Sequence, residues 1–160
     1  MADSSKAFDL VFEGEATAVG KMRNDIKVRW GGDEFDLATD EGGFHGGDGT
    51  APPPLALFTA VLAGCIMTQI RAFGKRLKVQ IDGLDVATRL HWKGTPTAAG
   101  PYESEPVGFN LDITLDSPAG IDAQVALIQA ATKGCFIEQS LSDKFPVTHR
   151  LKTTDGWIDV

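Results

Sequence analysis

The first part of the chain alternates between hydrophobic and polar positions, which is the pattern of half-buried β-strands. Residues 26–37 predict a hairpin: Ile, Val and Trp alternate with basic residues, and a Gly-Gly-Asp turn at 31–33 leads into a return strand. Residues 7–12 and 15–19 predict a further pair of strands, separated near Gly14. We therefore expect an antiparallel β-meander of three or four strands over about residues 7–40.

Residues 40–54 contain five glycines and three prolines and predict a loop that leads into a helix. The helix is expected from about residue 54 to about residue 76, with a proline in its first turn. Residues 55–67 are apolar on every face, which predicts that the first half of this helix is buried all round. Its basic last turn suits the negative end of the helix dipole.

The second β region shows the clearest alternation in the chain, at residues 107–115. A long strand is also predicted over residues 84–92, and the Gly-, Pro- and Thr-rich stretch 94–106 is expected to be a loop. Two short strands are predicted at residues 148–152 and 156–160.

Two helices are predicted between these strands. Ser117 as cap and Pro118 at the first position predict a helix that runs to about Thr132. Lys133 and Gly134 break it, and a shorter helix is expected to start at Cys135 and end near Ser142. The order of elements predicts an α+β protein with one domain over residues 1–160, whose C-terminal α+β part covers residues 78–160.

Charge and length limit the classes of function. The 160 residues carry a net charge of −7, with a pI of about 4.8, which disfavours binding to nucleic acid and to anionic membranes. The most apolar run has 13 residues, whereas a membrane-spanning helix needs roughly 20. The first residues lack the basic-then-apolar pattern of a signal peptide. We expect a soluble, cytoplasmic protein with no nucleic-acid or membrane partner.

The chemistry-bearing residues are two cysteines, Cys65 and Cys135, which lie 70 positions apart in separate predicted helices. If the fold brings them together, thiols in a reducing compartment suggest redox chemistry. Cys135 lies at a predicted helix start, where the dipole would favour its thiolate. Cys65 lies in apolar surroundings and needs a cation to become reactive. Arg23 is our first choice for that cation and Arg29 the second.

Other interpretations of the same residues stay open. Buried free cysteines are more often inert than reactive. The three histidines, His45, His91 and His149, could complete a zinc site with the cysteines, but no ligand-spaced motif is present, and we expect neither a metal nor a cofactor. The glycines at 46–49 lack the Lys-Ser/Thr of a phosphate-binding loop, which favours a tight turn.

Several short motifs occur in an order that resembles the OsmC/Ohr family, the osmotically inducible protein C and organic hydroperoxide resistance proteins. A Gly-Gly loop precedes prolines and a buried helix that contains Leu-Ala-Gly-Cys; a strand beginning Gly-Leu-Asp-Val and a second Gly-Cys follow. The matching segments are residues 46–47, 52–54, 62–65, 83–86 and 134–135. The resemblance extends from about residue 10 to the C-terminus.

The resemblance implies an OsmC-like fold: antiparallel sheets around a long buried central helix with two further helices, in an intertwined homodimer with active sites at the interface. It also implies a thiol peroxidase cycle. Cys65 would attack a small apolar organic hydroperoxide and become a sulfenic acid, and Cys135 would condense with it to a disulfide. An external dithiol would reduce this disulfide. Arg23 would hold the Cys65 thiolate.

One position departs from the family pattern. Peroxidase members carry a glutamate ten residues before the first cysteine, which binds the active-site arginine; this chain has Leu55 there. Asp40, Glu41 or Glu138 could serve instead, the arginine could be held by the thiolate alone, or this branch could be an inefficient peroxidase. A hydroperoxide reductase in oxidative stress defence is therefore weighed against a non-catalytic small-ligand-binding or redox-sensing dimer, and against a structural dimer domain.

Overall fold

The computed structural model describes residues 7–141 and 147–160, and they form a mixed α+β protein, as predicted. The chain divides between Leu57 and Phe58 into two compact units, each with its own sheet. The expected single domain over residues 1–160 stays a prediction. The end of the short helix near Ser142 lies outside the described residues.

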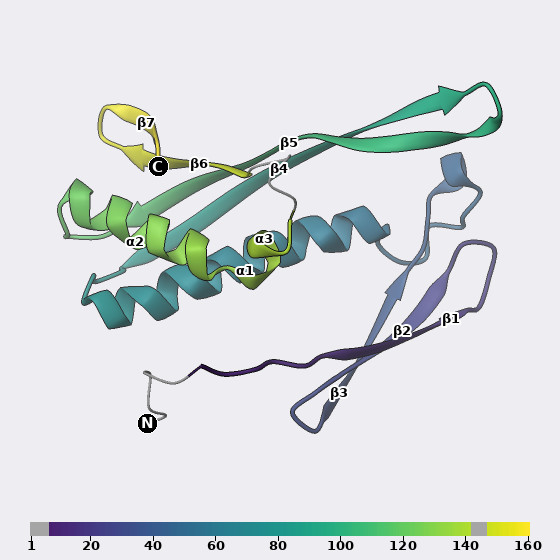
Figure 1. Ribbon diagram of the computed structural model, residues 1–160, viewed down its shortest axis with the longest axis horizontal. Helices are drawn as coiled ribbons and strands as arrows, with labels where there is room; N and C mark the ends of the chain where they lie inside the picture. Colours follow the sequence, from purple (N-terminus) through teal and green to yellow (C-terminus); the bar gives the residue numbers. More distant parts are fainter. Residues whose placement is uncertain (1–6, 142–146) are drawn as a thin grey trace. The chain divides into compact units, whose positions relative to one another are not determined.

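The first unit holds a three-stranded antiparallel sheet in the order β1-β2-β3, drawn in purple and blue in Figure 1. The strands are β1 (Glu13–Ala18), β2 (Asn24–Trp30) and β3 (Asp33–Thr39). Positive φ angles at Gly31 and Gly32 form the hairpin turn, and Ile26 pairs with Leu37. The meander is confirmed. The separation at Gly14 is wrong, because Gly14 lies inside β1, and residues 7–12 form no strand.

The glycine-rich segment after β3 folds back on itself around a one-turn helix, η1 (Gly43–His45). The Gly47 N–H donates to the Gly42 carbonyl, and the Gly49 N–H donates to the Glu41 carbonyl. A Cβ atom on Gly47 would lie 1.9 Å from the Glu41 oxygen, so only glycine fits there. These backbone N–H groups are used inside the loop, which bears out the tight turn rather than a phosphate cradle.

The long helix α1 (Pro54–Leu77) matches the predicted helix to within one residue at its end. Its buried residues lie along one face, at spacings of four: Leu62, Ile66, Ile70 and Gly74. Burial on every face is wrong for the single chain, because Val61 is 48% exposed. By length and composition α1 is apolar enough to cross a membrane, so the length of the apolar run does not exclude a membrane-spanning helix. Three of the side chains of α1 nevertheless belong to the protein core.

The second unit contains a four-stranded sheet in the order β4-β5-β6-β7. Its strands are β4 (Gly83–Thr97), β5 (Gly100–Asp116), β6 (Val147–Thr153) and β7 (Gly156–Asp159). The alternation at residues 107–115 is confirmed, with Phe109, Leu111, Ile113 and Leu115 buried. The strands predicted near residues 150 and 158 are also present.

The loop predicted at residues 94–106 is wrong. Strands β4 and β5 continue through it as a long antiparallel hairpin, in which Lys93 pairs with Glu105 and Gly94 with Ser104. A turn at residues 98–99 closes the hairpin. The ring of Tyr102 lies within 3.3 Å of the position that a Cβ on Gly94 would take, so the glycine makes room for a cross-strand aromatic residue.

Two helices link β5 to the parallel strand β6 and cover the same face of the sheet as α1 (Figure 1). Helix α2 (Ile121–Gly134) starts later than predicted: Gly120 is its N-cap, and Ser117 instead donates to the Gln80 carbonyl. Helix α3 (Phe136–Gln139) follows after Cys135. Leu127, Ile128 and Ala131 of α2 pack with the inward side chains of α1, β5 and β6 into one core.

Candidate functional site

The fold of the second unit brings the two cysteines together. Cys65 lies on α1, one residue before the buried Ile66, and is half-buried; Cys135 lies between α2 and α3 and is fully buried. Cys65 packs against the buried cluster that contains Cys135, and both are free thiols. Residues 70 positions apart are thus in contact because α1 and the α2–α3 corner pack on the same face of the sheet.

A close approach of two helices places Cys135. A Cβ atom on Gly134, at the end of α2, would lie 2.5 Å from the ring of Phe73 on α1, so glycine is needed for the helices to pack this closely. The Cys135 N–H donates to the Thr132 carbonyl at 3.2 Å, and the Gln139 N–H donates to the Cys135 carbonyl at 2.9 Å. The backbone of the second cysteine is therefore fixed on both sides.

Electrostatics keep Cys135 protonated. Burial, followed by the neighbouring Cys65 thiol, raises the pKa of the Cys135 thiol to about 12. The Glu138 backbone lowers this pKa, and the charges of Cys65 and Glu138 raise it. The prediction that a helix start favours the Cys135 thiolate is therefore wrong: α3 has only four residues, and burial outweighs its N–H groups.

Sequence reasoning missed a buried contact between a glutamate and a histidine beside the second cysteine. His149 Nε2 on β6 lies 3.1 Å from Glu138 Oε2 on α3, and the two side chains are 5% and 9% exposed. Glu138 was considered as a partner for the arginine and His149 as a zinc ligand; the structure pairs them with each other. Nothing local signals this contact, because the residues are 11 positions apart and meet only when β6 pairs with β5.

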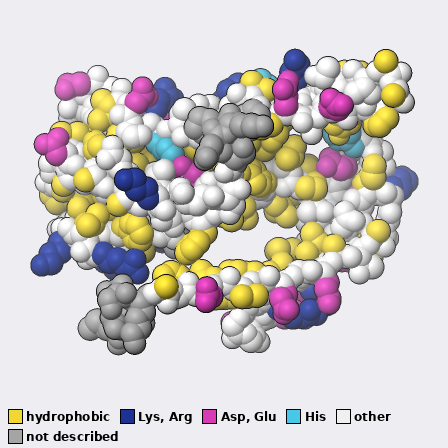
Figure 2. Space-filling model, in the orientation of Figure 1, with side chains coloured by type: hydrophobic (Ala, Val, Ile, Leu, Met, Phe, Trp, Pro, Cys, Tyr) yellow, Lys and Arg dark blue, Asp and Glu magenta, His cyan; other side chains and the backbone are white. Residues whose placement is uncertain are grey.

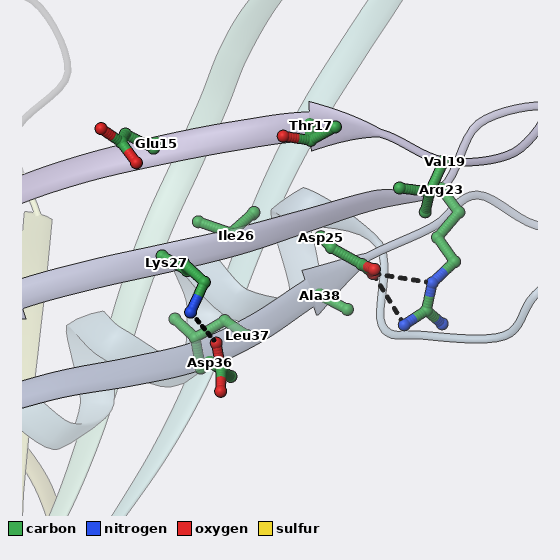
Figure 3. A pocket seen from close by; sticks show the side chains of 10 residues that line it. All are labelled: Glu15, Thr17, Val19, Arg23, Asp25, Ile26, Lys27, Asp36, Leu37 and Ala38. Carbon is green, nitrogen blue, oxygen red and sulfur yellow. Dashed lines mark hydrogen bonds and ion pairs between the residues drawn. The ribbon is translucent and has the colours of Figure 1, made fainter.

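Arg23 belongs to the other unit, in the turn between β1 and β2. Its guanidinium contacts Asp25 at 2.8–2.9 Å and donates to Thr50 Oγ1 at 3.0 Å. Figure 3 shows Arg23 directed toward Asp25 at one end of a hollow of about 580 Å³, while Lys27 and Asp36 pair farther along the sheet. Arg23 thus has a carboxylate partner, Asp25, that sequence reasoning did not name. The role of Arg23 beside Cys65 stays a prediction.

The acids proposed for the arginine have other partners. Asp40, only 1% exposed, accepts the Thr50 N–H at 2.9 Å, the Thr50 hydroxyl and the Glu41 N–H. The Thr50 backbone hydrogen bond is the main reason that the pKa of Asp40 is lowered, and the Arg23 charge adds to it. Glu41 lies 3.2 Å from His45. Arg29, the second choice, pairs with Glu15 and Glu34.

The described residues include no cluster of three or more His, Cys, Asp or Glu side chains that could hold a metal ion. Leu55 lies in the first turn of α1 and is 51% exposed. The position that carries a glutamate in the peroxidases thus presents an apolar side chain at the surface of this chain.

Comparison with known proteins agrees with this architecture. The model of the family described as OsmC-like protein matches residues 47–150, well over half of the chain. A crystal structure of an OsmC-like hydroperoxide resistance protein from Jannaschia sp. CCS1 is 51% identical, covers 94% of this chain and 98% of its own, and has a TM-score of 0.56. No curated protein matches.

More distant solved structures share the fold. An organic hydroperoxide resistance protein OsmC from Legionella pneumophila is 17% identical over 93% of this chain and 100% of its own, with a TM-score of 0.66. Another from Elizabethkingia anophelis, with thiocyanate bound, is 16% identical over 92% and 97%, with a TM-score of 0.67. With the family model and a relative that is half identical along nearly its whole length, this chain belongs to the OsmC-like family.

Proposed function

We propose that this protein is a thiol-dependent peroxidase that reduces organic hydroperoxides in oxidative stress defence. Cys65 attacks the distal peroxide oxygen, the O–O bond breaks, the alcohol leaves, and the Cys65 sulfur becomes a sulfenic acid. Cys135 then forms a disulfide with Cys65 and releases water, and an external dithiol reduces that disulfide. The observation that carries the proposal is the contact between the Cys65 and Cys135 thiols.

The different surroundings of the thiols support this division of roles. Burial raises the pKa of the Cys135 thiol and so keeps it protonated. Cys65 is also the more accessible of the two. The structure therefore suits Cys65 to meet the peroxide first and Cys135 to wait as the protonated second thiol.

Aromatic residues of the same unit favour an apolar substrate. Phe58 lies seven residues before Cys65 on α1, about two helical turns away and on nearly the same side. Its ring packs against Trp92 and Phe109, with ring centroids 5.9 and 6.2 Å apart. An apolar wall of this kind favours alkyl or lipid hydroperoxides over hydrogen peroxide, because burial of apolar substrate surface adds to binding.

We also propose that the protein acts as a homodimer. Figure 2 shows hydrophobic side chains on the surface. Phe35 and Leu37 of the first unit are 49% and 48% exposed, and Val61 on α1 is 48% exposed. Isolated exposed hydrophobic residues are ordinary, but an apolar long helix that buries only one face in its own chain is explained by a second copy. In such a dimer, Arg23 would stabilise the Cys65 thiolate. A dithiol-dependent cycle fits a cytoplasmic location.

The test is stopped-flow measurement of thiol loss after one equivalent of cumene hydroperoxide is added, with hydrogen peroxide in parallel. We expect rapid loss of both thiols, faster with the organic peroxide. The Cys65→Ser variant should lose all turnover, and Cys135→Ser should stop at a sulfenic acid that a dimedone probe labels. Full hydroperoxide turnover in Cys65→Ser would refute the proposal.

The absence of the glutamate at position 55 favours one second candidate, a redox-sensing dimer that uses the same thiols slowly. Without that carboxylate the arginine depends on Asp25 for its orientation. Thiols that persist for minutes in the stopped-flow experiment would support the sensor and exclude an efficient peroxidase.

A further inference from the structure

The buried Glu138–His149 pair has no part in the cycle described so far, although it adjoins the second thiol. Its two partners come from different elements, α3 and β6, and their side chains are 9% and 5% exposed. Polar side chains that are this deeply buried are costly to desolvate, and the hydrogen bond between them offsets only part of that cost. The position of these side chains next to the Cys135 thiol therefore suggests a functional role.

Both members of the pair contact the groups that hold Cys135. The Glu138 backbone lowers the pKa of the Cys135 thiol, while the Glu138 carboxylate contacts His149. His149 Nε2 also lies 3.5 Å from Thr132 Oγ1, and the carbonyl of Thr132 accepts the Cys135 N–H. The Glu138–His149 contact thus links a residue three positions before the thiol, Thr132, to one three positions after it, Glu138, and connects both to strand β6.

We propose that Glu138 and His149 are positioning residues for Cys135, which keep its sulfur against Cys65 during disulfide closure. The inference rests on the proposed function for its biological meaning. In closure, the Cys135 sulfur forms a bond to the Cys65 sulfur, the S–O bond of the sulfenic acid breaks, and the departing hydroxide takes the Cys135 proton to give water. The Cys135 sulfur is oxidised and the Cys65 sulfur is reduced; the hydroperoxide is the original oxidant.

The charges around the Cys135 thiol provide a second measurable effect, on the pH dependence of disulfide closure. Among the described residues, Cys65 from α1 and Glu138 from α3 act on the Cys135 charge, and His149 from β6 acts through Glu138. The Glu138 carboxylate, as a like charge, disfavours the Cys135 thiolate. Replacing it by an amide keeps a hydrogen-bonding group for His149 and removes that charge.

Closure can be measured without any peroxide. Ellman's reagent first attaches an aryl thiol to Cys65; Cys135 then attacks this mixed disulfide and releases a second aryl thiolate, and its proton goes to solvent. The first release reports on access to Cys65, and the second reports on the position and ionisation of Cys135. We expect two releases per chain in the wild type and one in Cys135→Ser.

The variants separate positioning from general stability. Glu138→Ala and His149→Ala should each slow the second release by about tenfold or more, because small misplacements of reacting groups cost up to about a hundredfold, with the first release unchanged. The double variant should be no slower than either single variant. Glu138→Gln should keep closure within about threefold of wild type and shift its pH profile to lower pH. Asp112→Asn, which removes the Arg150 ion pair on the opposite face of the sheet, is the matched control and should change neither release.

Equal second-release rates in wild type, Glu138→Ala and His149→Ala would overturn the proposal. So would an equal loss in Asp112→Asn, or a loss in Glu138→Gln as large as in Glu138→Ala. The peroxidase itself is judged separately by cumene hydroperoxide: thiols that resist the peroxide but still close with Ellman's reagent would refute the proposed function and leave the positioning role standing.

Discussion

The two units of the chain are each stabilised by a different kind of internal interaction. In the second unit, Leu62, Leu111, Ile128 and other large side chains are fully buried around one core that includes Cys135. In the described part of the first unit, the buried residues are polar, Thr39 and Asp40, while Phe35 and Leu37 are exposed. The thiols therefore lie in a region that has its own core, and the candidate arginine lies in one that does not.

This difference fits the proposed dimer, in which a complete site would need more than one chain. A three-stranded sheet whose apolar side chains are exposed removes little apolar surface from solvent, so hydrophobic burial adds little to its stability. The first unit relies instead on its backbone ladder and on the Asp40 and Arg23 contacts with Thr50. We infer that the exposed apolar face of the first unit is covered when two chains assemble. The thiol region would then be complete in a single chain, whereas the arginine region would need the second chain.

The largest effect is expected from Arg23→Ala. If the first unit supplies the cation for Cys65, the rate of Cys65 oxidation by cumene hydroperoxide should fall by about a hundredfold or more, the usual cost of removing one preorganised charge-stabilising group. The control is Arg29→Ala on β2, which removes an arginine whose side chain pairs with Glu15 and Glu34. Equal rates in wild type and Arg23→Ala would mean that the thiol region works alone.

The next effect concerns assembly. Leu37→Asp puts a charge on the open face of the first sheet, where Leu37 is 48% exposed in the single chain. We expect a dimer in the wild type by light scattering and a shift toward monomer in the variant, together with a Tm that depends on protein concentration. Thr114→Asp, an exposed position on β5, serves as the control. A wild-type protein that stays monomeric at all concentrations would contradict the assembly.

A smaller gain is expected from Leu55→Glu. This change restores the family's carboxylate at the start of α1, where an acidic residue also suits the helix dipole. If Asp25 only partly replaces that carboxylate as the arginine's partner, oxidation of Cys65 should become about tenfold faster. The matched variant Leu55→Gln has a similar shape without the charge and should stay at the wild-type rate; a Leu55→Glu rate no faster than that of Leu55→Gln would show that Asp25 suffices.

The sequence could predict the elements that local signals specify, and it could not predict the contacts that depend on distant elements. Alternation at residues 107–115 and the apolar helix that begins at Pro54 are local signals; the helix was predicted to within one residue, and the strand was predicted in its second half only, because β5 already begins at Gly100. Residues 94–106 were mistaken for a loop because glycine and proline usually break strands, whereas here pairing such as Lys93 with Glu105 overrides composition. Cys65 and Cys135 were identified as a candidate redox pair from the sequence, and the family resemblance implied their roles, but their proximity and the Glu138–His149 contact depend on packing across distant elements.

The smallest effect is expected from Asp40→Asn. This change weakens the hydrogen bonds that the Asp40 carboxylate accepts in the first unit and leaves the thiols of the second unit unchanged. The Asp40 pKa is lowered in the folded protein, mainly by the Thr50 N–H, so the carboxylate contributes stability above its unfolded pKa and loses it as the pH falls through the folded value. Asp40→Asn should therefore lower the Tm near neutral pH, and the difference from wild type should shrink below roughly pH 4. Asp33→Asn, at the exposed start of β3, is the control. A Tm difference that is constant from pH 3 to pH 7 would mean that Asp40 acts through shape and not through its charge.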